Sequence, residues 1–429
     1  MLKLSQCMIV KNEEKNIENA LSWAKSIVFE QIVVDTGSTD CTKEIAERMG
    51  AEVLDFEWVD DFSAAKNFAL EQATGDWILF FDADEYMTSE DAKKLTEYLS
   101  QLQRNPEKNK SVLAINCKLV NIDDNGKAMS VYDAIRIFKN DKTLRFTGSI
   151  HEHLNNDPVS VLWSDEMTVI HTGYSESSVK ETNKVERNID LLRKAIAAAP
   201  DNLALKVYLA DSLKMNTDDE SKAEADKYFT EAIEHGTGKI FYKFRVKAYM
   251  HFLNKLVNDS EKRSQCEELC KKALMDFPNS LDFEYFMASL LNFKGSYKEA
   301  WDLLKAGEER LVNGRDIGIA NCVQADPTML YSQLLLSAQG LGDTAAIAEY
   351  ALLLLEADKT RQEILSPLIG RLLGEGTPPD TVLTILSGVY TISDPNDLII
   401  IARAAKNCGA AEFALAIVEM AKEILGDRN

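Results

Sequence analysis

Gly75-Asp76-Trp77-Ile78-Leu79-Phe80-Phe81-Asp82-Ala83-Asp84 is the segment from which the fold of the N-terminal region can be inferred. A short apolar run between turn residues is typical of a fully buried strand, and Trp77 to Phe81 form such a run. Two carboxylates at i and i+2, Asp82 and Asp84, follow it. In a turn they can converge on one cation, and Mg²⁺ and Mn²⁺ prefer oxygen ligands. The segment therefore predicts a buried strand that ends at a divalent-metal site.

The sequence before this segment alternates between strand and helix patterns. Apolar runs predict further strands, and amphipathic segments between them predict helices; the strands are expected at 5–10, 31–35 and 53–57, and the helices at 14–26, 42–49 and 63–72. Strands that alternate with helices imply a parallel sheet covered on both faces. Ligands of such sheets bind at the carboxyl ends of the strands.

Polar residues follow three of these strands. Asn12-Glu13 comes after the first strand, Asp35-Thr36-Gly37-Ser38-Thr39-Asp40 after the second, and Asp82 to Asp84 after the fourth. A carboxylate at Asp35 can accept a hydrogen bond from a nucleobase N–H, and the small turn residues let a nucleotide approach closely. The residues Ser38, Thr39 and Asp40 can also cap the next helix. We expect these polar sets to meet at one edge of the sheet.

The remaining sequence predicts two further regions. Residues 111–175 contain β-like runs at 112–120, 129–139, 144–148 and 167–171, which predict a mixed or antiparallel extension that completes the acceptor side of the site. After about Ser175, Pro200 and Pro278 are followed at equal offsets by similar apolar and small residues, and Pro395 repeats part of this frame. This pattern is similar to tetratricopeptide repeats. The predicted domains are residues 1–175 and 176–429.

Composition limits the partners and the compartment. The formal net charge of −21 disfavours nucleic acid and anionic membranes. No apolar run of 18 residues exists, so no membrane span is expected. The N-terminus looks like a first strand and not like a signal peptide. The seven scattered cysteines are expected to be buried small residues in a reducing compartment, and we expect a cytoplasmic protein.

The motifs resemble those of family 2 glycosyltransferases of GT-A fold. The resemblance rests on residues 7–13, 34–40, Ala65-Lys66-Asn67 and 75–84, in that order and at that spacing. It implies an α/β GT-A domain, followed here by an all-α tetratricopeptide-like domain, and a Mn²⁺ or Mg²⁺ cofactor. It also implies that Asp35 reads the base, that Asp84 binds the metal, and that Asp82 lies near the ribose. The full set of expected nucleotide-sugar-binding residues is Asn12, Glu13, Asp35, Ser38, Lys66, Asp82 and Ala83.

A second cluster follows the D-x-D motif. Three of the five histidines lie between residues 151 and 171. His151 and His171 belong to Phe146-Thr147-Gly148-Ser149-Ile150-His151-Glu152 and Ile170-His171-Thr172-Gly173-Tyr174, and His153 directly follows Glu152. Arg136 lies upstream. The family places its catalytic carboxylate after the D-x-D motif, and many members add a metal-binding histidine. The resemblance therefore implies Glu152 as the base and His171 as a metal ligand, with Asp133 the competing base. Arg136 and His151 are further candidate site residues. The family's usual E-D and Q-x-x-R-W patterns are absent.

The layout of the whole chain is similar to that of S-glycosyltransferases that modify bacteriocin peptides, and to other bacterial transferases with tetratricopeptide repeats. It implies a metal-dependent, inverting glycosyltransferase with a UDP-sugar donor and a peptide or protein acceptor. Because such repeats bind peptides or mediate dimers, a homodimer through the helical repeats is also expected. The alternatives are a cell-surface glycan acceptor and a non-catalytic repeat scaffold whose transferase domain has decayed.

Overall fold

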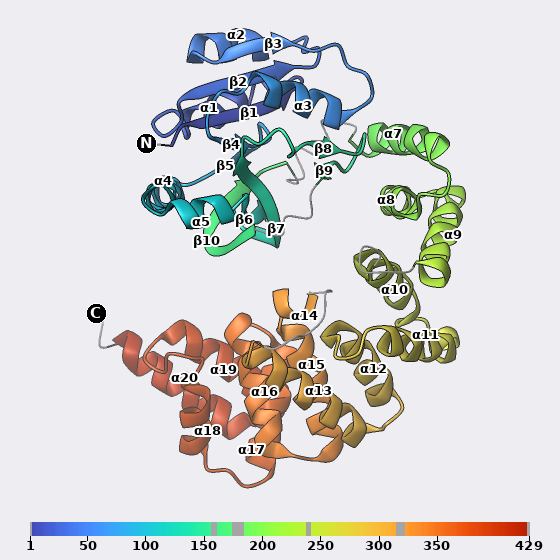
Figure 1. Cartoon of the computed structure of the whole chain (residues 1–429). Helices are drawn as coiled ribbons and strands as arrows, with labels where there is room; N and C mark the ends of the chain where they lie inside the picture. Colours follow the sequence, from blue (N-terminus) through green and yellow to red (C-terminus); the bar gives the residue numbers. More distant parts are fainter. Residues whose placement is uncertain (1, 156–160, 174–183, 237–241, 315–321, 427–429) are drawn as a thin grey trace. The chain divides into compact units, whose positions relative to one another are not determined.

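The computed structural model describes residues 2–155, 161–173, 184–236, 242–314 and 322–426 (Figure 1). The chain divides into two compact units, Met1–Tyr228 and Phe229–Asn429. The first unit contains the predicted α/β domain and the first helices after it. In its described residues the second unit is helical.

The four predicted parallel strands form one half of the main sheet. The strand order is β3-β2-β1-β4-β7-β6-β10-β5, and β3, β2, β1 and β4 run parallel. These strands and the helices between them are β1 (Leu4–Val10), α1 (Ile17–Ser22), β2 (Glu30–Asp35), α2 (Thr42–Met49), β3 (Glu52–Asp55), α3 (Phe62–Gln72) and β4 (Trp77–Phe80). The helix expected at 14–26 is thus shorter, whereas α2 has its predicted bounds and ends at Gly50, whose φ of 88° provides a left-handed cap.

Both faces of the sheet are covered, as predicted. Alternate residues of a strand point to opposite faces, and in β4 Ile78 and Phe80 pack with Ala69 and Leu70 of α3. The other two strand residues, Trp77 and Leu79, belong to a cluster on the opposite face, which includes Leu95, Leu99 and Leu102. An uninterrupted apolar run is therefore required in β4, because neither face meets solvent.

The extension is mixed, as the β-like runs predicted. Strand β7 runs antiparallel to both β4 and β6, and β10 runs parallel to β6. A small separate sheet pairs β8 with β9. The elements are β5 (Glu85–Tyr86), α4 (Ser89–Arg104), α5 (Pro106–Ser111), β6 (Ala114–Ile122), β7 (Ala128–Lys139), β8 (Phe146–Thr147), β9 (His153–Leu154) and β10 (Val161–His171). The sequence pattern did not predict β5, α4 or α5.

Helices follow from residue 184 onward in the described residues, and many of them pack against the next helix within the same unit. They are α7 (Lys184–Ala198), α8 (Leu203–Leu213), α9 (Asp219–His235), α10 (Tyr242–Leu256), the 3₁₀ helix η2 (Ser260–Lys262), α11 (Arg263–Asp276), α12 (Leu281–Phe293), α13 (Tyr297–Val312), α14 (Cys322–Ala325), α15 (Thr328–Leu341), α16 (Thr344–Ala357), α17 (Gln362–Gly374), α18 (Pro379–Leu386), α19 (Pro395–Asn407) and α20 (Ala411–Gly426). No helix among the described residues has the length and apolar character that a membrane span needs.

The predicted repeat of prolines matches the structure at two helix pairs and differs at Pro395. Pro200 and Pro278 lie in the turns of α7–α8 and α11–α12, and the second helix of each pair begins three residues later. In contrast, Pro395 is itself the first residue of α19, where its missing N–H needs no partner. The prolines therefore mark helix starts, but in two different registers.

The cysteine prediction is right for part of the set. All seven cysteines are free thiols, and Cys7, Cys117, Cys266 and Cys270 are buried as expected. The prediction is wrong for Cys41 and Cys322, which are exposed. Cys41 immediately precedes the first turn of α2, where its side chain is not part of the core.

A buried amide pair joins the sheet to α1, and its removal should destabilise the first unit. The Gln31 side-chain amide donates to Gln6 Oε1 at 2.7 Å, and Gln6 Nε2 donates to the Ala20 carbonyl at 2.9 Å. Gln6→Leu leaves a buried carbonyl without its donor, so we expect unfolding to become easier by about 1–3 kcal/mol. Urea unfolding followed by circular dichroism measures this loss. Gln101→Leu, at an exposed position of α4, is the control and should leave the midpoint unchanged.

Candidate active site

Asp35 is the last residue of β2, and its carboxylate is buried at the carboxyl end of the sheet. The residue is 2% exposed. Its Oδ1 accepts from the backbone N–H groups of Gly37 and Ser38, both at 2.9 Å, and Gly37 has a φ of 103° that favours glycine. Among the described residues Asp35 Oδ2 is buried and has no hydrogen-bond donor. A buried acceptor of this kind is costly unless a ligand N–H reaches it.

The other predicted residues of this edge hold the loops after β1 and β2 together. Asn12 has a φ of 58°; its backbone N–H donates to Ser38 Oγ at 2.9 Å, and its Oδ1 accepts from the Thr39 N–H at 2.8 Å. The Glu13 N–H donates to Thr42 Oγ1 at 2.7 Å. The contacts of Asn12, Glu13 and Ser38 thus fix the shape of the turn that carries Asp35.

The two aspartates of the D-x-D motif face different partners. Asp82 lies 3.5 Å from Lys66 Nζ and 3.6 Å from the Arg136 guanidinium. Asp84 Oδ2 lies 3.3 Å from His171 Nε2. Ala83 between them is 7% exposed and belongs to the apolar cluster that packs α1 and α2 on the sheet. The motif therefore presents one carboxylate to two cations and the other to an imidazole.

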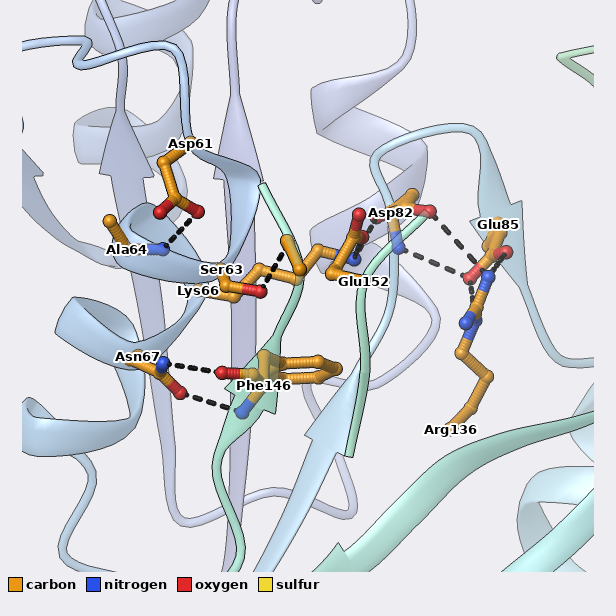
Figure 2. A network of polar contacts seen from close by, with 11 residues as sticks. Asp61, Ser63, Ala64, Lys66, Asn67, Asp82, Glu85, Arg136, Phe146 and Glu152 are labelled. Atoms are coloured by element: carbon orange, nitrogen blue, oxygen red, sulfur yellow. Dashed lines mark hydrogen bonds and ion pairs between the residues drawn. The ribbon is translucent and has the colours of Figure 1, made fainter. Parts of the chain in front are cut away.

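Lys66 connects the predicted base to the D-x-D motif (Figure 2). It comes from α3, is only 5% exposed, and pairs with Glu152 Oε1 at 2.7 Å. The rings of Phe80 and Phe146 lie 5.1 and 5.3 Å from its ammonium group. Burial opposes the charge on Lys66, yet Asp82 and Glu152 together raise its pKa.

Arg136 completes this network from β7. Its guanidinium makes two hydrogen bonds, of 2.8 and 2.6 Å, to the carboxylate of Glu85, which is 1% exposed. The Glu85 carboxylate also accepts from the Asp82 N–H at 3.2 Å. Burial tends to raise the pKa of Asp82, but Lys66 and Arg136 lower it to about 2. Glu85 was not predicted as a site residue, although its position next to the D-x-D motif was a signal.

The Asp84–His171 pair has the properties of a metal site. His171 Nδ1 lies 2.7 Å from Asn121 Oδ1. The Asn121 amide nitrogen in turn donates to Ser130 Oγ at 2.7 Å. Because an amide oxygen only accepts, Nδ1 carries a hydrogen. Burial opposes the charge on His171, yet Asp84 raises its pKa by accepting from Nε2–H. A divalent cation between the two side chains would take the place of that hydrogen. Asn121 was not predicted, because only the register of β6 against β10 places it opposite His171.

Gly173 gives these two side chains their space. A Cβ at this position would lie 2.1 Å from Asp84 Oδ2 and 2.6 Å from His171 Nε2. One oxygen and one imidazole nitrogen fit Mn²⁺ or Mg²⁺ whose other ligands are diphosphate oxygens and water. Within the described ranges no group of three or more His, Cys, Asp or Glu side chains could hold a metal.

Two predicted residues lie apart from this network. Asp133 accepts from Asn116 Nδ2 and Lys118 Nζ, both at 2.9 Å, and its side chain is 42% exposed. Asp133 thus pairs with other residues than Lys66, the partner of Glu152. His151 directs its ring onto Tyr208 of α8, with ring centroids 3.8 Å apart.

The comparisons with known proteins concern the family and the fold of the N-terminal domain. The family model described as glycosyl transferase family 2 matches residues 5–105. This chain therefore carries a family 2 glycosyltransferase domain, and the predicted resemblance and fold class are confirmed.

Two curated relatives extend the similarity beyond that domain. A TPR repeat-containing protein of Synechococcus elongatus is 30% identical over 269 residues, which are 60% of this chain and 63% of that protein. The SPbeta prophage-derived glycosyltransferase SunS of Bacillus subtilis is 27% identical over 294 residues, 66% of this chain and 65% of the relative. The chain thus spans less than two thirds of the length of either relative.

Among solved structures, the chain is similar to glucosyl-3-phosphoglycerate synthase from Mycobacterium tuberculosis in complex with Mn²⁺, UDP and glucosyl-3-phosphoglycerate. The identity is 23% and the TM-score 0.23, over 28% of this chain and 44% of that chain.

Gly173→Ala tests the metal site without removing a ligand. The added methyl group must displace Asp84 or His171, so we expect Mn²⁺ affinity to fall at least about tenfold, as with loss of a supporting residue. Calorimetric titration of Mn²⁺ in the presence of UDP measures this. Gly374→Ala is the matched control, because a Cβ there meets nothing within 4 Å. Unchanged Mn²⁺ affinity in Gly173→Ala would show that the ion does not bind between these residues.

Proposed function

We propose that this protein is a metal-dependent, inverting glycosyltransferase that moves a sugar from a UDP-sugar to a peptide or protein acceptor. The observation that carries the proposal is the separation of roles in the D-x-D turn. Asp84 faces His171 at 3.3 Å as one half of a metal site, while Asp82 faces the Lys66 that holds Glu152. The proposal therefore assigns the metal ligands, the donor contacts and the base to adjoining side chains at one edge of the sheet.

The donor is assigned from the strand ends. Asp35 Oδ2, which has no donor among the described residues, suits the N–H of a uracil base, since it is a buried acceptor. We assign the ribose to the neighbourhood of Asp82, as predicted. A divalent ion held by Asp84 and His171 would stabilise the negative charge of the leaving diphosphate. Burial opposes the charge on Asp82, but the buried Lys66 and the half-buried Arg136 lower its pKa to about 2, so Asp82 is ionised at neutral pH.

Glu152 is assigned as the base. In an inverting transfer the acceptor attacks the anomeric carbon opposite the leaving group, and a carboxylate removes the acceptor's proton. Glu152 is paired with Lys66 next to Asp82, whereas Asp133 is held by Asn116 and Lys118. Since the reaction needs a carboxylate near the D-x-D turn, the contacts favour Glu152 over Asp133.

The acceptor class is inferred from the resemblance and from the helical region. The relative SunS is named a glycosyltransferase, and the Synechococcus elongatus relative is named for its TPR repeats. Paired helices present surfaces suited to an extended peptide or to a second copy of the chain. We place the reaction in the cytoplasm, and the exposed thiols of Cys41 and Cys322 agree with a reducing compartment.

A screen of UDP-sugars for Mn²⁺-dependent hydrolysis, followed by mass spectrometry of acceptors, tests the proposed function. We expect turnover of at least one donor with Mn²⁺ present and its loss on chelation. Asp84→Ala should abolish metal-dependent turnover while circular dichroism shows a folded protein. Asp380→Ala, an exposed aspartate of α18, serves as the control. A wild-type protein that binds no UDP in the presence of Mn²⁺ would support the scaffold alternative.

Glu152→Gln and Asp133→Asn distinguish the two candidate bases. Each change removes a negative charge and keeps the shape of the side chain. We expect Glu152→Gln to slow transfer by ~10²–10⁴-fold, the usual contribution of a general base, and Asp133→Asn to stay within a few-fold of wild type. The affinity for UDP and the circular dichroism spectrum should be unchanged in both variants, because Lys66 keeps Asp82 as an anionic partner in Glu152→Gln. The opposite ranking of the two transfer rates would assign the base to Asp133.

A further inference from the structure

The loop that carries Glu152 has a constrained backbone. Gly148 and His151 have φ values of 96° and 53°, in the left-handed region that side chains other than glycine seldom adopt. The start of α3 holds one end of the loop: the Ser149 carbonyl accepts from the Phe62 N–H at 2.9 Å, and the Gly148 carbonyl accepts from Ser63 Oγ at 2.6 Å. The conformation of His151 must be maintained by further contacts, because it is locally unfavourable.

Tyr208 provides such a contact from the helical region. The His151 and Tyr208 rings are stacked, with centroids 3.8 Å apart and an interplanar angle of 14°. Tyr208 lies on α8 and is half-buried, so part of its ring is covered by neighbouring residues. Stacked rings contribute attraction beyond the area they bury. The stack therefore favours one orientation of the residue that directly precedes Glu152.

The other helix of the pair anchors to the same part of the transferase domain. On α7, Lys194 Nζ lies 2.6 Å from Asp60 Oδ2, and the Arg187 guanidinium lies 5.6 Å from the centre of the Phe62 ring. Asp60 and Phe62 lie immediately before and at the start of α3, which carries Lys66. The α7–α8 pair thus contacts the segments that carry both partners of the Lys66–Glu152 ion pair: the start of α3 and the loop after β8.

We propose that Tyr208 is a positioning residue for the reaction, which holds Glu152 in place by stacking on His151. This inference rests on the proposed function, because it takes Glu152 as the base. A change in the His151 backbone moves the Cα of Glu152 directly, and a shift of about 1 Å in a catalytic group can cost roughly 10²-fold in rate. The first helical pair is then a part of the catalytic unit as well as the start of the repeat region.

Substitutions in the full chain test the stack. Tyr208→Ala should lower kcat for donor turnover by between about tenfold and a hundredfold, with KM and the affinity for UDP within about twofold of wild type. Tyr208→Phe keeps the ring and should keep the activity. His151→Asn removes the other ring at a residue type that tolerates positive φ. It should lose as much activity as Tyr208→Ala, and the double variant should lose no more than either, since both act through one contact.

NMR of the histidine ring protons gives a readout independent of catalysis. The His151 signals should be shifted upfield by the Tyr208 ring in wild type and in Tyr208→Phe, and should return to ordinary values in Tyr208→Ala. Tyr228→Ala is the matched control, because Tyr228 contacts Glu224, Lys206 and Lys227 on the helices and is not the ring that stacks on His151. If Tyr208→Ala does not fold, Tyr208→Leu takes its place in the experiment, because leucine keeps the apolar volume. The same loss of kcat is expected.

The outcomes separate this inference from the proposed function. Wild-type kcat in Tyr208→Ala, additive losses in the double variant, or an equal loss in Tyr228→Ala would each overturn the positioning role. A wild-type protein with no donor turnover at all would contradict the proposed function instead, and the NMR signals would then still show whether the stack exists.

Discussion

The charge on buried Lys66 is the constraint on which the site depends. An ammonium group that leaves water must find anionic partners, and removing one of them is strongly destabilising. Lys66 is 5% exposed and finds Glu152 at 2.7 Å and Asp82 at 3.5 Å. One cation therefore requires that the loop after β8 and the turn after β4 come together, although they are distant in sequence. Figure 2 shows this convergence around the first turns of α3.

The remaining charges of the site are arranged around that pairing. Asp82 accepts a second cation, Arg136, and Arg136 is itself fixed by two hydrogen bonds to Glu85. Asp84 is the carboxylate that meets His171, under a glycine that leaves both side chains room. The alternation along Asp82, Ala83 and Asp84 thus separates an ion-pair network from the proposed metal ligands.

The sequence predicted the parts of this arrangement that depend on local patterns. The strands β1, β2 and β4 are continuous apolar runs because both faces of the sheet are covered, so their positions and their polar ends could be predicted. The contributions of Asn121 and Tyr208 could not, because they depend on strand register and on the packing of helices against a distant loop. The role of Glu85 could not be predicted either, because it depends on the hydrogen bonds that Arg136 of β7 donates to it. The helix α4 was missed although its apolar residues cover the sheet.

The grouping of α7 and α8 with the sheet has a consequence for the exchange of repeat domains between transferases of this kind. The change from strands to helices, near residue 175, is the natural place to join two halves when only the sequence is known. A hybrid joined there would lose three contacts of the transferase domain with the first helical pair. His151 would lose Tyr208, Asp60 would lose Lys194, and Phe62 would lose Arg187. The compact unit ends instead at Tyr228, within α9. A graft that keeps the first helical pair and replaces only the later helices would preserve every one of these contacts while giving the protein the later repeats of another chain.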